Sequence, residues 1–390
     1  MVAPRELRPY ALVSGSMTLG YGSIYTLLAD LRHRFGFSGT QLGLIVAAGF
    51  LAGFMTQLLL ARLADKGRAA LMVRGGASVA ALAMLGGAVA TRFWEFVLVR
   101  LVLGIGSGAV SPAIRRVVIT RDPEGVGANL GRLASFEVAG FVLGPLVAAV
   151  SAQLFGIRAP FLLLATLLVV VVALTARLDL SAGPVTADRR VFRGLLAAPA
   201  MKAALAACVA FYVTVGIFEA VWAVLLSDHG AQTWLIGVTL SLFTVPMIFL
   251  APVGGREAQR RGPIRVISIS IGVATICTFS YGVLPSLWML LAVSAVHAVA
   301  DSFTMPGTQV AAALASTPDH ASSAQGLLGA TGLAVAGLTG LVAGFVYQHA
   351  GRLVLFGGTA ATMTAFLLAA ITLDRRTAAP SPSASAGSPR

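Results

Sequence analysis

The stretch Ala61-Arg62-Leu63-Ala64-Asp65-Lys66-Gly67-Arg68 lies between two long apolar runs, at about 39–61 and 71–91. A helix that crosses a membrane needs about 20 apolar residues, and both runs are long enough. The stretch between them gathers cations around a single carboxylate. A loop this short has no fold of its own, so the helices on either side must hold it. We therefore expect a polar hinge between two membrane spans.

A second stretch, Gly255-Arg256-Glu257-Ala258-Gln259-Arg260-Arg261-Gly262, also lies between two apolar runs. At one constant offset, the first part of the chain matches the second at Gly36 and Gly230, Gly43 and Gly237, Arg62 and Arg256, Ala64 and Ala258, and Pro112 and Pro306. Repeated matches at a single offset indicate a duplicated half. Parallel repeats of this kind build one large class of secondary transporters.

The first stretch resembles the loop signature of the major facilitator superfamily. The residues that match it, which we call the latch, are Arg62, Asp65, Lys66, Gly67 and Arg68. Ala61 stands where the family usually has a glycine, one residue is missing before the second glycine, and Gln259 replaces the aspartate in the second copy. The resemblance covers about residues 10–373. It implies that the latch holds the cytoplasmic side closed in one state, and that the second copy is weaker.

The composition excludes an ordinary soluble protein. Of the 390 residues, 57% are hydrophobic and 11% are charged, whereas soluble domains have about 45–50% and about 25%. The mean hydropathy is +0.87. Twelve spans of about 20 residues leave room for short loops, a linker and two tails, but not for a soluble domain.

We therefore expect an all-α membrane protein with twelve transmembrane helices in two pseudo-symmetric six-helix halves. The expected spans are 10–30, 39–61, 71–91, 93–116, 127–152, 157–177, 202–226, 233–254, 264–284, 286–313, 322–348 and 351–373. The expected domains are an N-terminal six-helix bundle (1–177), a cytoplasmic linker (178–200), a C-terminal six-helix bundle (201–373) and a disordered cytoplasmic tail (374–390).

The net charge of +13 could indicate a nucleic-acid partner, but the placement of the cations argues against one. Most Lys and Arg fall at the expected cytoplasmic ends of the spans. The opposite ends hold only Arg32, Arg34, Arg92, Arg158 and Arg352. This positive-inside bias predicts a multi-pass protein of the plasma membrane with both termini in the cytoplasm. The expected partners are the lipid bilayer, a small-molecule substrate and protons. We expect a monomer and no nucleic acid.

No sequence pattern indicates a cofactor, a metal or an enzyme. Gly104-Ile-Gly106-Ser-Gly108 looks like a phosphate-binding turn, but it lies inside an apolar run without the strand such a turn needs. Cys208 and Cys277 are isolated in apolar runs and are expected to be core residues.

Ionisable side chains inside apolar spans are costly by at least a few kcal/mol, so each is a functional candidate. Arg100, followed by Gly104 and Gly106, resembles a family pattern associated with proton transfer, although Leu103 replaces a frequent glutamine. Glu137 lies in the fifth expected span, at a depth that differs from that of Arg100 by about 6 Å. We expect Glu137 to alternate between a proton and Arg100. The alternative is a structural glutamate that caps a neighbouring helix.

Two further pairs are candidates. His297 and Asp301 are four residues apart and share a helix face, so they could hold a coupling proton or form a structural pair. Glu219 precedes Trp222 by three residues, and a carboxylate beside an aromatic ring suits a lipophilic cation in a substrate cavity. The alternative for Glu219 is a position at the outer interface.

The fifth expected span holds the most specific pattern. Gly131, Gly140 and Gly144-Pro145 resemble, by their spacing, the antiporter signature of drug/proton exporters in the same superfamily. Ala148 and Ala149 replace the two glycines that usually follow. The resemblance implies proton-coupled efflux of small amphipathic molecules by alternating access. The alternatives are an uptake symporter or facilitator of a small organic solute, and a non-transporting membrane sensor.

Overall fold

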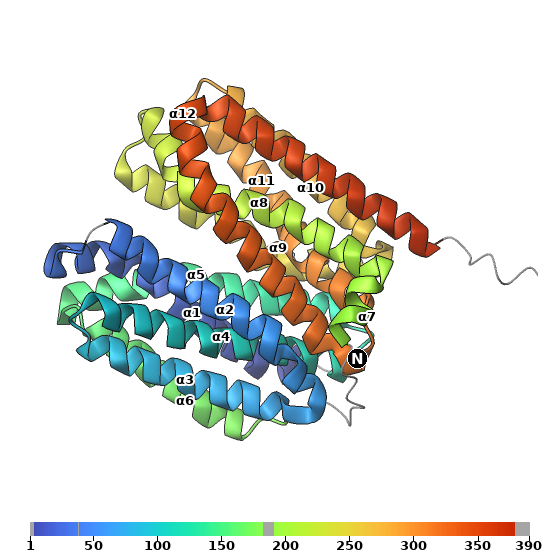
Figure 1. The fold of residues 1–390 in the computed structure, drawn as a ribbon, viewed down its shortest axis with the longest axis horizontal. Helices are drawn as coiled ribbons and strands as arrows, with labels where there is room; N and C mark the ends of the chain where they lie inside the picture. Colours follow the sequence, from blue (N-terminus) through green and yellow to red (C-terminus); the bar gives the residue numbers. More distant parts are fainter. Residues whose placement is uncertain (1–3, 38, 182–190, 379–390) are drawn as a thin grey trace, which may run out of the picture.

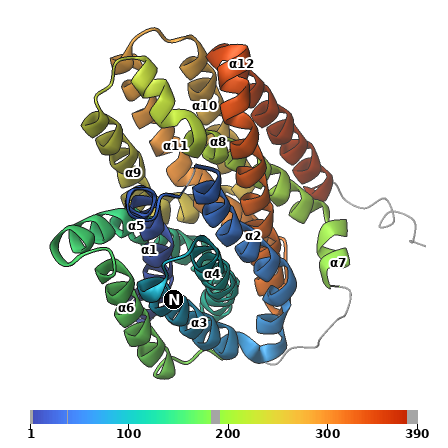
Figure 2. The ribbon, with the colours of Figure 1, turned by 60° about the vertical axis from the view of Figure 1, so that its left-hand side comes forward.

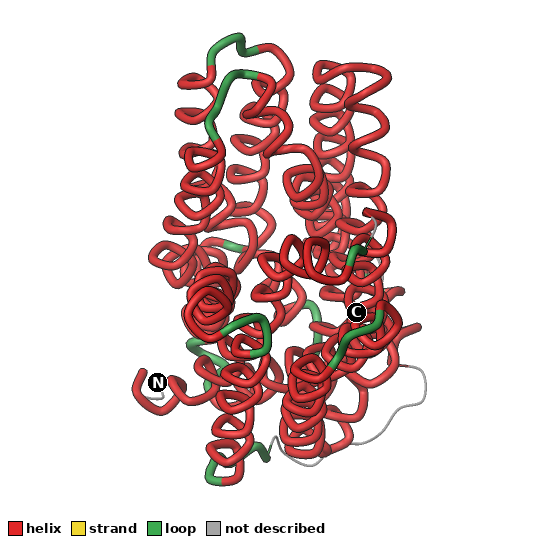
Figure 3. Tube along the Cα trace, turned by 90° about the vertical axis from the view of Figure 1, so that its left-hand side faces the viewer, coloured by secondary structure: helices red, strands yellow, loops and turns green. Residues whose placement is uncertain are grey.

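The computed structural model describes residues 4–37, 39–181 and 191–378, and within these ranges the chain is helical with short loops and no strand (Figure 3). The elements are α1 (Pro4–Phe35), α2 (Gly39–Leu63), η1 (Ala64–Arg68), α3 (Ala69–Val89), α4 (Phe93–Arg121), α5 (Val126–Phe155), α6 (Ala159–Ala176), α7 (Val191–Ala197), α8 (Pro199–Asp228), α9 (Thr233–Arg261), α10 (Pro263–Val283), α11 (Leu287–Leu314), η2 (Pro318–His320) and α12 (Ala321–Ala378). Helices suit a lipid environment because each satisfies its own backbone hydrogen bonds.

The helices gather in two groups. Figure 1 shows α1–α6 on one side of the molecule, here called the first bundle, and α8–α12 on the other, here called the second bundle. The buried apolar side chains divide in the same way: one cluster spans residues 7–180, and two others span residues 195–370 and 213–356. The first limb of α12 reaches across to pack beside α2 (Figure 2).

Eight segments of the described chain are long and apolar enough to cross a membrane. Two of them each join two expected spans: Leu44–Val89 runs through η1, and Pro318–Arg376 contains all but the end of α12. Within α12, Gly351 has a φ of 82°, which interrupts the helix at a residue type that adopts this conformation readily. Figure 1 shows α12 as two limbs joined by a sharp turn.

Several expected boundaries are wrong. α4 continues to Arg121 instead of ending near 116, and Arg115 and Arg116, at the end of the expected span, are buried. α12 continues to Ala378, so the tail expected from 374 begins later; residues 379–390 lie outside the described ranges. In α4 the residues past 116 begin with Val117, Val118 and Ile119, which are apolar and buried, so the apolar run itself is longer than expected.

The expected linker is partly helical. It contains α7, and α8 already begins at Pro199; residues 182–190 lie outside the described ranges. The start of the linker is fixed to the first bundle, because the backbone carbonyl of Asp179 accepts hydrogen bonds from Tyr10 Oη and Arg121 Nη2, both at 2.7 Å. Hydrogen bonds from Ser181 hold the pKa of the Asp179 carboxyl below its ordinary value, and the Arg121 guanidinium adds to this effect.

Glycines of α5 allow a close crossing with α1. A Cβ atom at Gly140 would lie 2.0 Å from the carbonyl oxygen of Gly15, and one at Gly144 would lie 2.4 Å from that of Leu19. Small residues are frequent at such contacts in membranes, where close backbone approach supplies the attraction between helices. Two glycines of the antiporter pattern therefore fix how α5 packs on α1.

The glycines of α4 have the same role. A Cβ atom at Gly104 would lie 2.4 Å from the carbonyl oxygen of Gly49 in α2, and one at Gly106 would lie 2.6 Å from that of Gly76 in α3. These glycines lie inside a helix between two neighbouring helices. They do not form a phosphate-binding turn.

Gly140→Ala tests the α1–α5 crossing. The added methyl group must move one helix, and overpacking of this kind costs about 1–3 kcal/mol. We expect a lower Tm in detergent and less protein in the membrane. Gly75→Ala is the control, because no atom lies within 4 Å of its Cβ position; that variant should match or slightly exceed the wild-type Tm. Equal Tm values for the two variants would contradict the packing assignment.

Candidate functional site

The turn η1 directs one carboxylate inward. Gly67 has a φ of 77°, a conformation that glycine adopts without strain. The side chains of Arg62, Lys66 and Arg68 are exposed, whereas Asp65 is only 3% exposed. The latch therefore presents its cations to the surroundings and buries its only carboxylate.

The Asp65 carboxylate joins three elements. Its Oδ1 lies 3.0 Å from Arg116 Nε of α4, and it accepts hydrogen bonds from the backbone N–H groups of Ser322 (2.9 Å) and Ser323 (2.7 Å) at the start of α12. The first N–H groups of a helix have no partner within the helix, and the helix dipole favours a negative charge there. Asp65 therefore has both a cation and a helix start as partners. The carboxylate of an ion pair within the first bundle is thereby hydrogen-bonded to the second bundle.

The second copy makes the reciprocal contact with an amide. Gln259 of α9 accepts a hydrogen bond from the backbone N–H of Gly127 (2.6 Å) and donates to the carbonyl groups of Pro123 (3.2 Å) and Glu124 (2.8 Å). These groups surround the start of α5. A helix start of each bundle is therefore held by a side chain of the other, once by a carboxylate and once by an amide.

Apolar and backbone contacts join the bundles at the same end. A buried cluster contains residues of both bundles: Ile119, Val126, Leu130, Ala258, Val266, Val310, Ala313 and Ala321. A Cβ atom at Gly131 would lie 2.2 Å from the carbonyl oxygen of Ala251, and one at Gly127 would lie 2.1 Å from that of Gly255. We call this region, with Asp65 and Gln259, the seam. Gly131 of the antiporter pattern thus belongs to the seam, unlike Gly140 and Gly144.

A second buried ion pair lies between α4 and α5. Arg115 Nη2 lies 2.9 Å from Glu137 Oε2, and Ser14 Oγ of α1 donates to Glu137 Oε1 at 2.7 Å. Arg115 and Glu137 are both buried. The adjacent arginines of α4 therefore pair with different carboxylates: Arg116 pairs with Asp65 in the seam, and Arg115 pairs with Glu137.

The pairing predicted between Glu137 and Arg100 is wrong in this structure. The Arg100 guanidinium lies over the Tyr21 ring, 4.3 Å from its centroid, and beside Gly49. Arg100 and Arg115 are separated by about 22 Å along α4, and it is Arg115 that contacts Glu137.

His297 and Asp301 come together as their spacing predicts. His297 Nε2 lies 3.6 Å from Asp301 Oδ1, and the Tyr281 hydroxyl lies 3.1 Å from His297 Nδ1. The histidine is fully buried, and its ring contacts those of Phe218 and Phe243. The pair is enclosed within the second bundle, away from the seam.

Glu219 and Trp222 do not line one cavity together. Trp222 is 2% exposed and stacks on Phe218, with 4.5 Å between the ring centroids, whereas Glu219 is exposed. The boundary between exposed and buried faces of α8 passes between them. Glu219 therefore lies on the exposed face of α8, and Trp222 on the buried one.

Sequence reasoning missed several partners. Ser14, Tyr21 and Tyr281 are single polar or aromatic residues in apolar runs, and nothing in a sequence shows which helix face they occupy. Ser322 and Ser323 had a usable signal, because hydroxyl residues directly before an apolar run are typical of a helix start. Among the described residues, no group of three or more His, Cys, Asp or Glu side chains could hold a metal.

Known proteins resemble this chain along most of its length. A family profile described as Major Facilitator Superfamily matches residues 10–219 and 203–389. The multidrug resistance protein MdtG of Dickeya zeae is 24% identical over 68% of this chain and 68% of its own length. MdtG of Salmonella typhimurium is 24% identical over 68% of this chain and 69% of its own length.

A solved structure has the same fold. The crystal structure of the human organic anion transporter MFSD10 (TETRAN) superposes with a TM-score of 0.71, covering 94% of this chain and 100% of that chain. Its sequence identity of 16% supports the fold and nothing beyond it.

Asp65→Asn should loosen the seam. Removing one partner of a buried ion pair costs about 3–5 kcal/mol, because it leaves the Arg116 charge uncompensated. Spin labels on cysteines replacing Lys66 and Asp319, two exposed residues flanking the contact, would report the separation of the bundles. We expect Asp65→Asn to shift the distance distribution to longer values.

Gln259→Ala is the matched comparison. It removes neutral hydrogen bonds, each of which contributes about 0.5–1.5 kcal/mol, and should shift the distribution less. The native Cys208 and Cys277 are buried, which limits background labelling. An unchanged distribution in Asp65→Asn would show that the ion pair does not hold the seam.

Proposed function

The chain belongs to the Major Facilitator Superfamily and is a multi-pass membrane transporter of small molecules; on that premise, we propose that it is a proton-coupled exporter of small amphipathic molecules. The observation that carries the proposal is the Asp65 contact, a reversible polar link between two bundles at one end of the molecule. The similarity to multidrug resistance proteins and the Gly131–Pro145 spacing favour export.

The proposed architecture has twelve spans in two six-helix halves. α2 and α3 count separately because η1 divides them, and α12 counts twice because Gly351 divides it. The domains are 1–177, the linker 178–200, 201–373 and a short tail after α12. We propose that the η1 end and both termini lie in the cytoplasm of a plasma-membrane protein, because Lys and Arg are concentrated toward the η1 end. We propose that it acts as a monomer without nucleic acid.

The proposed mechanism is alternating access between the bundles. In this structure the seam joins the bundles at the η1 end, the end that we propose to be cytoplasmic. Opening it requires Asp65 to leave the start of α12 and Gln259 to leave the start of α5, and water then solvates the freed groups. Both contacts are polar and small, so they can break and re-form without loss of either bundle's core.

We assign the coupling proton to Glu137. When its carboxylate is charged, Arg115 and Ser14 bind it. Protonation cancels the charge that holds Arg115, and Arg115 is adjacent to Arg116, the seam cation. A proton on Glu137 can therefore alter the seam through two consecutive side chains of one rigid helix. Arg100 acts apart from this pair, through its contact with Tyr21.

The proposed substrate site lies between the bundles near Glu219. An exposed carboxylate inside a membrane helix suits an amphipathic cation. Trp222, on the buried face of α8, stacks on Phe218 and thereby supports the packing of the helix that carries Glu219. His297 and Asp301 are a second candidate for proton binding, with Tyr281 as the nearest hydroxyl group.

Two other functions make different predictions. An uptake symporter would accumulate substrate on the cytoplasmic side, a facilitator would only equilibrate it across the membrane, and a non-transporting sensor would move neither substrate nor protons. Everted membrane vesicles energised with an inward-acidic gradient distinguish the three. An exporter accumulates a lipophilic cation such as ethidium and releases lumenal protons when the cation is added. Accumulation only in right-side-out vesicles would overturn the export proposal, and no flux in either would support the sensor.

Glu137→Gln should abolish uphill transport in proteoliposomes with an imposed pH gradient. The amide keeps the size and a hydrogen bond to Ser14 but cannot bind the proton, so downhill exchange should continue. The control is Ser14→Ala, which removes one hydrogen bond and leaves the titrating group in place.

The double variant Glu137→Gln/Arg115→Gln separates a proton carrier from a structural glutamate. It removes both charges, so no buried charge is left unpaired. If Glu137 is structural, the double variant should recover uphill transport. If Glu137 carries the proton, uphill transport should stay absent in both variants.

A further inference from the structure

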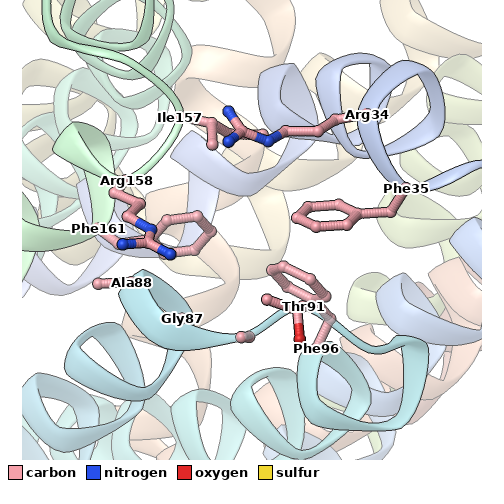
Figure 4. A pocket seen from close by; sticks show the side chains of 10 residues that line it. Arg34, Phe35, Gly87, Ala88, Thr91, Phe96, Ile157, Arg158 and Phe161 are labelled. Carbon is pink, nitrogen blue, oxygen red and sulfur yellow. The ribbon is translucent and has the colours of Figure 1, made fainter.

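A pocket at the end of the first bundle opposite η1 has no part in the proposed transport cycle. It lies where α1, α3 and α5 end and α4 and α6 begin. Figure 4 shows Arg34 and Arg158 at its rim, with the rings of Phe35, Phe96 and Phe161 forming its wall. The pocket combines two cationic heads with an aromatic interior.

The pocket is positively charged although the end of the molecule where it lies has few cations. Cations are scarce at this end of the chain, as the positive-inside bias requires, yet Arg34 and Arg158 converge on one place. The lining contains no acidic residue. Among the side chains that the structure describes, no carboxylate forms an ion pair with either arginine. The nearby Glu95 accepts hydrogen bonds from the backbone N–H groups of Thr91 and Arg92.

Helix geometry adds to the positive potential. Arg158 occupies the position directly before α6, so the partial positive charge of that helix end lies at the pocket. Two guanidinium groups and a helix start favour an anion with several oxygen acceptors, which is the chemistry of a phosphate.

The surroundings favour an anion that is attached to a hydrocarbon chain. Leu154 and Phe155 end α5 next to the pocket and are 66% and 78% exposed, and Val89, between two lining residues, is 73% exposed. Apolar side chains this exposed on a membrane protein face lipid. The arginines therefore lie at headgroup level directly above an acyl-chain surface.

We propose that this pocket binds the headgroup phosphate of an anionic phospholipid in the leaflet opposite the seam. The guanidinium groups of Arg34 and Arg158 hold the phosphate, and the acyl chains lie along Val89, Leu154 and Phe155. The bound lipid would hold the ends of α1 and α5 to the starts of α4 and α6.

The test uses the full chain in detergent, titrated with dioleoyl phosphatidylglycerol and followed by native mass spectrometry. We expect specific adducts for the wild type and roughly tenfold weaker binding for Arg34→Gln/Arg158→Gln, since the variant cannot form the charge-assisted hydrogen bonds to the phosphate. The control is Arg375→Gln/Arg376→Gln, which removes the same charge from exposed positions at the end of α12 and should bind like the wild type.

Two further probes identify the ligand. Dioleoyl phosphatidylcholine has the same chains and a phosphate but no net charge, and should bind more weakly to the wild type. Glycerol 3-phosphate has the anion without chains, and should not compete at matched concentration. Retained lipid binding in Arg34→Gln/Arg158→Gln, an equal loss in the control variant, or equal binding of glycerol 3-phosphate would each overturn the proposal.

Discussion

A single buried carboxylate connects the two bundles of this protein. Asp65 faces an arginine of its own bundle and two backbone N–H groups of the other, so two of its three partners remain in place only while the bundles are together at this end. A buried charge without compensation is costly, whereas a charge in water is not. The contact therefore permits two arrangements, closed and dry or open and wet, and disfavours partly open ones. That is a physical requirement for alternating access.

The second seam contact differs in kind from the first. Gln259 is neutral, so its release leaves only unpaired hydrogen-bonding groups, which water satisfies readily. Asp65 and Gln259 occupy matching positions of the repeat and hold matching helix starts. The two contacts thus match in geometry, but only the first carries a charge. The closed state depends more on electrostatics at the start of α12 than at the start of α5.

Sequence reasoning identified the fold because the signals for it are physical and local. Apolar runs of membrane length, cations at one set of span ends and a repeated polar hinge all follow from the cost of placing polar groups in lipid. The i, i+4 spacing likewise predicted correctly that His297 and Asp301 lie side by side. These inferences needed no knowledge of which helices are neighbours.

The pairing of Glu137 with Arg115 could not be predicted from local signals, because it depends on how two helices pack. Depth along a helix follows from counting residues, and α4 does begin at Phe93 as expected, but depth alone does not show which side chains of two helices face each other. Arg115 lies inside the expected span 93–116, yet only the packing of α4 against α5 and α1 makes it the cation that faces Glu137. The same limit applies to Trp222, whose burial involves Tyr281 of another helix. Side-chain partners in a bundle follow from the packing of all helices together, and the arginines of α4 connect that packing to the seam.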